Sequence, residues 1–240
     1  MNFVYQDQNF CIIDDFLDDK LKTLVWNYVQ TEEFRHVRDP KWDKAFRLQD
    51  GNPLRGPAYL SHKNPLDEKR PTYPTRKGID IVFKNIIENM DKISKWVGSQ
   101  DKDWAFFFAR AYIYEMNQGL SWHRDNNYNA TGAFVYYAHP YWEYQWGGEL
   151  LIDPNIDRSV ENPTIELYEE GIKRGGSHLD TTHENKLLGN KAFGHFIQPK
   201  PNRLVILKSG IYHTIKKVDP SAGDNVRAII QGFFLHPKKD

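Results

Sequence analysis

The C-terminal half of the chain consists of short apolar runs separated by turn-forming residues, and this pattern restricts the fold more than any other feature. The runs cover residues 104–116, 133–138, 148–152, 203–207 and 227–235. Clusters of Gly, Pro, Asn and Asp between them are typical of antiparallel strands joined by turns, whereas βαβ units would place helices there. We therefore expect an all-β core over about residues 101–240. Because 240 residues commonly form one β-rich domain, we expect residues 1–240 to be a single domain.

Two apolar patterns with helical period precede this core and predict flanking helices in an N-terminal part of about residues 1–100. The first has the pairs Asp14-Asp15 and Asp18-Asp19 at its start, and their carboxylates suit a helix N-terminus. Its apolar positions are Leu17, Leu21, Leu24, Val25 and Tyr28. The second pattern covers residues 79–97 and predicts one helix that ends at Gly98, where a C-cap glycine belongs. The apolar stripe of each helix is expected to cover a sheet.

Two long segments have no regular period. The first, about residues 35–75, contains Pro40, Pro53, Pro57, Pro65, Pro71 and Pro74. The second is an insertion of about residues 153–198 within the β core. Such long segments are often binding loops or lids, although a disordered excursion is an alternative. They and their flanks carry Arg38, Arg47, Arg55, Arg76 and Arg174, a set compatible with a substrate that bears a carboxylate.

Charge and cysteine content exclude several classes of protein. The 32 Lys and Arg residues balance the 32 Asp and Glu residues, so no overall field would attract nucleic acid or an anionic membrane. The single cysteine, Cys11, excludes an internal disulfide and a cysteine-based zinc or iron–sulfur site. Without a secretory signal at the N-terminus or a run of 18 apolar residues, we expect a cytoplasmic protein with neither nucleic acid nor membrane as partner. The sequence does not indicate an oligomeric state.

Three side chains could form a metal site. His123 and Asp125 are two residues apart at a predicted strand end, so their side chains point to the same side. His213 follows the apolar strand of residues 203–207 and supplies a second imidazole. Two histidines and one carboxylate bind one face of a non-haem Fe(II) ion and leave the other positions open. His-x-Asp alone is a weak signal for a metal site. A His-x-Asp motif that is followed along the chain by Gly147-Gly148 and then by a second histidine is a more specific one.

These motifs resemble those of prolyl-4-hydroxylase-like 2-oxoglutarate oxygenases. Residues 114–125, YEMNQGLSWHRD, are similar to the family's Tyr, Gly, His-x-Asp strand, and residues 134–150, which end in GGEL, are similar to the hairpin that follows. The segment from Asn202 through His213 to Gly232 resembles the closing strands. The resemblance implies an all-β core with flanking helices, folded as a double-stranded β-helix or jelly roll.

The resemblance also implies cofactors and their ligands. Fe(II) would be held by His123, Asp125 and His213, with 2-oxoglutarate and O2 as cosubstrates and ascorbate as an additional reductant. Arg227 would bind the distal carboxylate of 2-oxoglutarate; a rim ion pair with Asp or Glu is the alternative. Tyr114 and Tyr137 would hydrogen-bond the cosubstrate. Should the register slip by one residue, Tyr112 and Tyr136 would replace them, and all of these tyrosines could also be core residues.

The implied activity is hydroxylation of an unactivated C–H bond in a small polar substrate such as an amino acid, a peptide or a natural-product intermediate. Asp125 favours hydroxylation over halogenation, because its carboxylate fills the position that a halide would take, while desaturation and ring formation stay open. Trp122, Arg124 and Trp146 are candidates for the pocket wall, or for the core. Two alternative functions are a hydroxylase that acts on prolyl or other side chains of a folded protein, and a non-catalytic β-helix binding module.

The other histidines are interpreted as surface or loop residues. They are His36, His62, His139, His178, His183, His195 and His236. Of these, His178 and His183 lie together in the insertion and form an alternative pair for a metal site.

Overall fold

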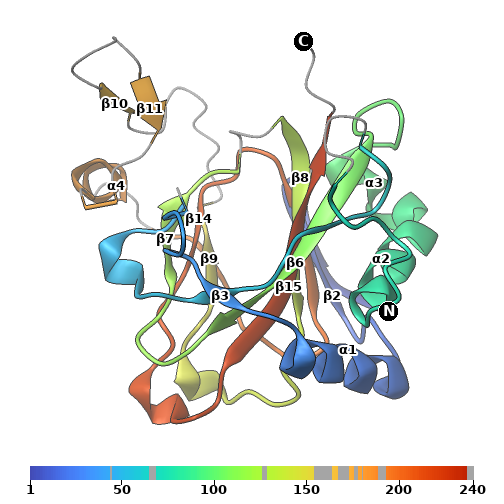
Figure 1. The fold of residues 1–240 in the computed structure, drawn as a ribbon. Helices are drawn as coiled ribbons and strands as arrows, with labels where there is room; N and C mark the ends of the chain where they lie inside the picture. Colours follow the sequence, from blue (N-terminus) through green and yellow to red (C-terminus); the bar gives the residue numbers. More distant parts are fainter. Residues whose placement is uncertain are drawn as a thin grey trace.

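The computed structural model (Figure 1) describes most of the chain. The described residues are 1–43, 45–64, 69–125, 129–153, 164–166, 173–175, 178–179, 181–188 and 193–236. The side chains of residues 164–166, 173–175 and 183, 184 and 187 lie outside this description.

Within the described residues, nine strands form one large antiparallel sheet. They are β1 (Asn2–Gln6), β2 (Phe10–Asp14), β3 (Arg35–His36), β4 (Leu54–Arg55), β5 (Tyr59–Leu60), β6 (Phe106–Tyr114), β8 (Ala130–Tyr137), β13 (Leu204–Lys208) and β15 (Arg227–Leu235). Their order is β1-β2-β13-β8-β15-β6-β4-β3, and β5 also pairs with β6. The predicted runs at residues 104–116, 133–138, 203–207 and 227–235 are thus confirmed as strands.

A smaller sheet faces the large one. Its strands are β7 (Leu120–His123), β9 (Leu150–Ile152), β12 (His195–Ile197) and β14 (His213–Ile215), in the order β12-β9-β14-β7. A further hairpin joins β10 (Thr164–Glu166) to β11 (Lys173–Gly175), and single 3-10 turns are η1 (Leu48–Asp50), η3 (Tyr144–Trp146) and η4 (Pro220–Ala222). Two facing antiparallel sheets whose successive strands alternate between them form a double-stranded β-helix, as the resemblance implied.

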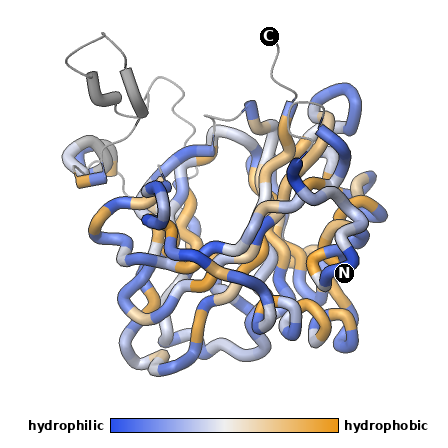
Figure 2. The backbone as a smooth tube through the Cα atoms, in the orientation of Figure 1, coloured by the Kyte–Doolittle hydropathy of each residue, from blue (hydrophilic) through white to orange (hydrophobic). Residues whose placement is uncertain are grey.

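The alternation of side chains along the long strands divides the apolar core into two layers. On β6, Phe107, Ala109 and Ala111 face the helices, whereas Tyr112 and Tyr114 face the small sheet. The same period-two pattern holds on β8 and β15. Figure 2 shows hydrophobic stretches gathered in the strands and in the helices beside them. The large sheet is therefore apolar on both faces, and its inner face forms a wall of the barrel.

The helices α1 (Asp19–Thr31), α2 (Ile79–Glu88) and α3 (Met90–Val97) cover the outer face of the large sheet (Figure 1). The Asp18 carboxylate accepts a hydrogen bond from the backbone N–H of Leu21 and so caps α1, as predicted. Gly98 ends α3 with a φ of 82°, which glycine adopts without a steric penalty. Among the described residues, no helix combines the length and apolar character needed to cross a membrane.

Two predictions about the N-terminal part need correction. The helix predicted over residues 79–97 is broken at Asn89, where φ is −115° and ψ is 20°. The Asn89 side chain donates a hydrogen bond to the Asn85 carbonyl oxygen. This break lets α3 turn onto β8 and β13. The part predicted as helical also begins with two strands, β1 and β2, and β2 pairs with β13 to extend the large sheet. The segment of about residues 35–75 is largely irregular, as predicted, with only short strands.

Candidate metal centre

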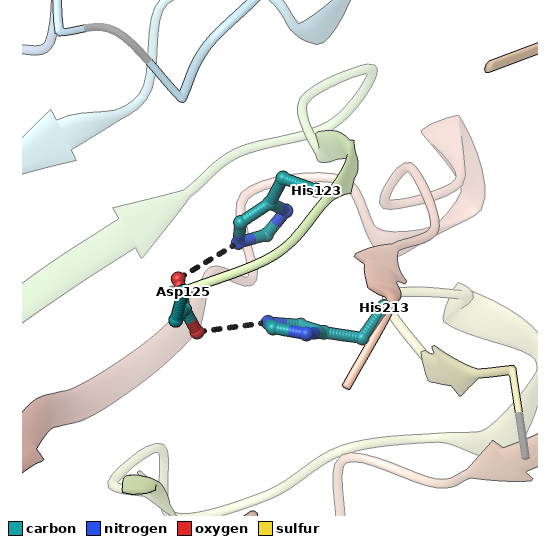
Figure 3. Close-up of side chains that lie close together, drawn as sticks. All are labelled: His123, Asp125 and His213. Carbon is teal, nitrogen blue, oxygen red and sulfur yellow. Dashed lines mark ion pairs between the residues drawn. The ribbon is translucent and has the colours of Figure 1, made fainter. Parts of the chain in front are cut away.

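His123, Asp125 and His213 lie close together (Figure 3) and line one cavity. The Asp125 Oδ1 atom is 3.6 Å from His123 Nε2, and its Oδ2 atom is 3.3 Å from His213 Nε2. One ligand atom from each residue lies within 4.8 Å of the other two. All three side chains are largely buried, with exposed fractions of 9–14%. The three residues could therefore hold one metal ion.

The strand register of the small sheet explains why residues ninety positions apart meet. In the antiparallel pair of β7 and β14, His123 lies directly opposite His213, and opposite residues in such a pair project to the same face. The centres of the two imidazole rings are 4.3 Å apart. Asp125 follows the end of β7 by two residues, and each of its carboxylate oxygens points to one of the two rings (Figure 3).

Backbone carbonyls fix the orientation of both imidazole rings. The Nδ1 atom of His123 lies 2.8 Å from the Ser121 carbonyl oxygen, and that of His213 lies 2.9 Å from the Ile211 carbonyl oxygen. Because a carbonyl only accepts, Nδ1 carries the proton and Nε2 presents its lone pair to the shared site. Burial, with the nearby His213 second, lowers the pKa of His123 to about 4. His123 is therefore neutral near pH 7, as a metal ligand must be.

A buried carboxylate supports the strand that carries His123. Asp50 is 3% exposed, and it accepts a hydrogen bond of 2.6 Å from the Ser121 hydroxyl. Gln49 donates to the same hydroxyl oxygen at 3.0 Å, and the Gly119 N–H donates to the Asp50 carbonyl at 3.0 Å. Burial raises the pKa of the Asp50 carboxyl. No sequence pattern predicts this contact, because Asp50 lies in the irregular segment, far from β7 along the chain.

Arg227 is fully buried on the inner face of the large sheet. Its Nε donates to the Gly148 carbonyl at 2.7 Å, one Nη lies 3.4 Å from the Tyr137 hydroxyl, and no carboxylate of the described residues lies within ion-pair distance. The other Nη and the Tyr114 hydroxyl are buried without a hydrogen-bond partner in the part of the chain that the structure describes. The rim ion pair considered as an alternative is thus absent among described residues, and a buried charge without a partner favours an anionic ligand.

The tyrosines predicted to surround this ligand lie on either side of Arg227. The guanidinium carbon is 5.3 Å from the ring centre of Tyr114 and 5.0 Å from that of Tyr137. Tyr136 faces the opposite side of the sheet, where its hydroxyl donates to Asn202. Tyr112 shares the inner face with Tyr114 and packs against Phe46. Of the two alternatives for a slipped register, Tyr136 is therefore directed away from the cavity.

One cavity joins the metal centre to Arg227. Its lining includes His123, Asp125, His213, Arg227 and Gln231, and its other walls are mainly apolar side chains of β8, β9, β13 and β15. The donor set fits Fe(II), because two imidazole nitrogens and a carboxylate on one side leave the opposite positions open to the cavity. The unpaired atoms near Arg227 fit a small dicarboxylate that reaches the same ion.

The three candidate wall residues occupy other places. Trp122 stacks on Tyr212 with ring centres 5.4 Å apart and lines a separate pocket together with residues of β9 and β12. Arg124 lies over the same tyrosine ring, at 5.6 Å, and Trp146 packs in the core against Trp142. None of the three is among the described residues that line the cavity of His123. A substrate role for Trp122, Arg124 and Trp146 stays a prediction that this geometry does not support.

The interpretation of the other histidines needs one correction. His139 is not a surface residue but is 1% exposed, with its ring nitrogens 3.1 Å from the Ala228 carbonyl oxygen and 2.7 Å from the Pro199 carbonyl oxygen. His178 stacks on Trp42 at 4.2 Å, while the side chain of His183 lies outside the described residues.

Comparisons with known proteins identify the family and the fold. The sequence profile of the 2OG-Fe(II) oxygenase superfamily matches residues 109–235, more than half of the chain. No curated protein sequence matches. Among solved structures, a prolyl-4-hydroxylase from Pseudomonas putida has a TM-score of 0.57 at 13% identity and covers 96% of this chain and 94% of its own.

Two further structures show the same fold. A prolyl hydroxylase from Trichoplax adhaerens, in complex with a hypoxia inducible factor oxygen degradation domain peptide fragment, has a TM-score of 0.55 at 18% identity, with coverages of 95% and 84%. An oxidoreductase of the 2OG-Fe(II) oxygenase family from Burkholderia pseudomallei has a TM-score of 0.54 at 8% identity, with coverages of 97% and 88%. At these identities the likeness concerns the fold, and it confirms the double-stranded β-helix.

Proposed function

Because the chain belongs to the 2OG-Fe(II) oxygenase superfamily, we propose that it hydroxylates an unactivated C–H bond of a small polar substrate such as an amino acid, a peptide or a natural-product intermediate. The enzyme class itself follows from the family: the protein is a 2-oxoglutarate-dependent non-haem iron dioxygenase. Fe(II), 2-oxoglutarate and O2 are the cofactor and cosubstrates of this class. Ascorbate as an additional reductant is part of the proposal.

The proposal assigns the iron ligands to His123, Asp125 and His213, and the distal carboxylate of 2-oxoglutarate to Arg227 with Tyr114 and Tyr137. One observation carries it: a fully buried arginine without an anionic partner among the described residues opens into the same cavity as the three ligands. A buried guanidinium costs several kcal/mol of solvation unless a partner compensates it (about 2–7 kcal/mol even for a neutral polar group). A bound carboxylate supplies this compensation.

Fe(II) with 2-oxoglutarate, when bound, would supply the oxidising chemistry: 2-oxoglutarate would lose CO2 and take up one oxygen atom of O2 to give succinate, and the other oxygen atom would enter the substrate C–H bond. The chain's own residues orient and enclose the reactants. The imidazoles of His123 and His213 are held by backbone carbonyls, so their lone pairs stay directed at the ion. Asp125 fills a third position with a carboxylate, which favours hydroxylation over halogenation. The apolar walls of the cavity keep bulk water from the reacting atoms.

We further propose that residues 1–240 act as one domain. The β2 strand and the three N-terminal helices all pack on the large sheet that carries Arg227, which supports this assignment. A cytoplasmic location is also part of the proposal, supported by Cys11, the single cysteine, which is buried and free.

A second candidate is hydroxylation of a protein or peptide side chain, such as a prolyl residue. It is favoured by one observation, that two of the structures with the same fold are prolyl hydroxylases and that one of them holds a peptide fragment. A non-catalytic binding module is the weaker alternative, because the three potential ligands and Arg227 are all in place.

An anaerobic titration with Fe(II) and 2-oxoglutarate tests the proposed function. We expect the weak visible charge-transfer band of a chelated 2-oxoglutarate complex in the wild-type protein, and its loss in His213→Ala. Arg227→Met should keep the band but raise the 2-oxoglutarate concentration for half-saturation about 10- to 100-fold, since a hydrogen bond to a charged group is worth about 1.5–3 kcal/mol. Lys84→Met, on the exposed face of α2, is the control. A band of full intensity in His213→Ala would contradict the ligand assignment.

A further inference from the structure

A second arginine lies on the inner face of the large sheet. Arg110 is in the middle of β6, and the alternation of side chains puts it on the same face as Tyr112 and Tyr114. In the pairing of β6 with β15, Arg110 lies directly opposite Gln231. Opposite residues of an antiparallel pair are neighbours on one face, so Arg110 and Gln231 form a polar pair within an otherwise apolar strand surface.

Gln231 connects this pair to the metal centre. Its side chain lines the same cavity as His123, Asp125 and His213, and Phe233 adjoins it on the same face. In the described part of the chain the carboxamide of Gln231 accepts and donates no hydrogen bond to another side chain or to the backbone. An amide that faces a cavity in this way is available to a ligand.

The charges around Arg110 leave an excess of one cation. The acid that Arg110 acts on is Asp43, which pairs with Arg55 at 3.3 Å. Burial raises the pKa of the Asp43 carboxyl, and the charge of Arg110 opposes this shift, as does that of Arg55. Even so, no carboxylate of the described residues lies within ion-pair distance of Arg110. The Nε of Arg110 is buried without a hydrogen-bond partner there, while another part of its guanidinium interacts with the Tyr112 hydroxyl. Two guanidinium groups therefore share one carboxylate.

We propose that Arg110 and Gln231 bind a carboxylate group of the substrate and thereby determine which compounds the enzyme oxidises. This inference rests on the proposed function, because it needs the substrate to enter the cavity of the iron ligands. A guanidinium and a neighbouring amide N–H are both donors, and together they match the two oxygens of a carboxylate. The net charge of one cation fits a monoanion better than a phosphate, whose second charge would lie close to Asp43.

The position of the pair also separates the substrate from the cosubstrate. Arg227 and Gln231 are four residues apart on one strand face, which is about 13 Å at the usual rise per residue. A dicarboxylate held at Arg227 can therefore reach the iron from one side, while a substrate carboxylate held at Arg110 and Gln231 approaches from the other. The carbon to be oxidised then lies a short distance from an anchoring carboxylate, as in an amino acid or the C-terminal residue of a peptide.

Matched pairs of carboxylates and amides test this proposal on the intact protein loaded anaerobically with Fe(II) and 2-oxoglutarate. The probes are the common L-amino acids and their N-acetyl derivatives, each compared with the corresponding primary amide. The readouts are the change of the charge-transfer band on binding and, after admission of O2, succinate formation above the rate without probe. We expect at least one carboxylate to give both signals, with an apparent Kd at least tenfold lower than that of its amide.

Variants identify the residues that make this distinction. Arg110→Met should raise the Kd of that carboxylate at least tenfold, Arg110→Lys should recover part of the loss, and Gln231→Leu should raise the Kd severalfold. The half-saturating 2-oxoglutarate concentration should stay unchanged in all three, which also shows that they fold. Lys84→Met, which removes an exposed cation on α2, is the matched control and should bind like the wild type.

Several outcomes would overturn the proposal. Amides that bind as tightly as acids, wild-type carboxylate affinity in Arg110→Met, or a panel in which no carboxylate alters the band would each contradict it while leaving the proposed function intact. A wild-type protein without any charge-transfer band would overturn the proposed function, and this inference with it.

Discussion

At the scale of single residues, buried polar side chains of the inner face divide the cavity into regions with different tasks. Arg227 is enclosed by Tyr114, Tyr137 and the Gly148 carbonyl, so its one unused edge can only meet a ligand inside the barrel. Arg110 has Asp43 near it and a neutral amide beside it. The first environment suits a tightly held cosubstrate, and the second suits a substrate that must be exchanged in each turnover.

His139 is a different kind of buried polar residue, since it faces backbone rather than the cavity. Its two ring nitrogens lie near the carbonyl oxygens of Ala228 and Pro199, while its ring packs on Trp142 at 4.8 Å. Burial lowers the pKa of His139 to about 4, although the two carbonyl oxygens oppose this shift. A neutral ring has a single N–H, so it donates to one of the two oxygens.

This lowered pKa predicts a loss of stability in mild acid. In the unfolded chain a histidine takes up its proton near pH 6.5, about 2.5 units above the folded value of about 4. Between these values the unfolded state binds more protons, so the stability present above pH 6.5 is lost as the pH falls, by about 1.4 kcal/mol per unit. Urea unfolding of metal-free protein at pH 7.5 and 5.0 measures this. Between these two pH values the free energy of unfolding of His139→Gln should fall by about 2 kcal/mol less than that of the wild type. An equal fall in both proteins would contradict the prediction.

At the scale of elements, the central pairing of β15 with β6 and β8 positions the inner-face side chains. Nine consecutive residues of β15 are in register with β6, from Arg227 opposite Tyr114 to Leu235 opposite Phe106. A shift by one residue would turn Arg227 and Gln231 to the helical side. Gly232 lies in this strand at a point where a Cβ atom would overlap the Phe108 carbonyl oxygen and come within 2.7 Å of the Phe134 ring.

Gly232→Ala should therefore destabilise the protein more than an alanine at an open glycine position. We expect the free energy of unfolding to fall by about 3 kcal/mol or more, because the backbone of β6 would have to move away from β15. Gly223→Ala is the matched control: nothing lies within 4 Å of its added Cβ, but its φ of 58° costs about 1–2 kcal/mol. Urea unfolding compares the two. Similar losses for both variants would contradict a close approach at Gly232.

The elements that the sequence predicted correctly are those whose own residues determine them. The strands near residues 104–116 and 227–235 alternate strongly, and His123, Asp125 and His213 combine ligand chemistry with strand ends. Arg110 and Gln231 stand out in the sequence as polar residues in apolar strands, but only the strand register shows that they lie opposite each other. The contact of Asp50 with Ser121 joins residues 71 positions apart, and the break at Asn89 depends on how α3 packs. Such features are set by tertiary contacts, which local patterns do not encode.

At the scale of the whole molecule, the segment outside the matched family region completes the structure that holds the site. The match begins at residue 109, yet β2 pairs with β13 and thereby shields an edge of the large sheet. Phe10, Cys11 and Ile13 of β2 are buried in the two core layers. The irregular segment contributes Asp50 beneath β7 and Asp43 beside Arg110. The N-terminal residues thus extend the large sheet through β2, and through Asp43 and Asp50 they also interact with residues of β6 and β7.

The metal centre should in turn stabilise the whole fold. Its ligands come from β7, β14 and the residues after β7, which are strands of only three or four residues in the small sheet, so an ion joins elements that are otherwise held by few backbone bonds. A ligand that binds only the folded state stabilises it by about 2.7 kcal/mol at 100 times its Kd. For a chain of this size that corresponds to a rise in Tm of about 5–10 °C. Mn(II), which accepts the same ligands without oxidation, allows a thermal unfolding scan in air. The wild type should show this rise, EDTA should reverse it, and His213→Ala should not show it; an equal rise in that variant would mean that the ion binds elsewhere.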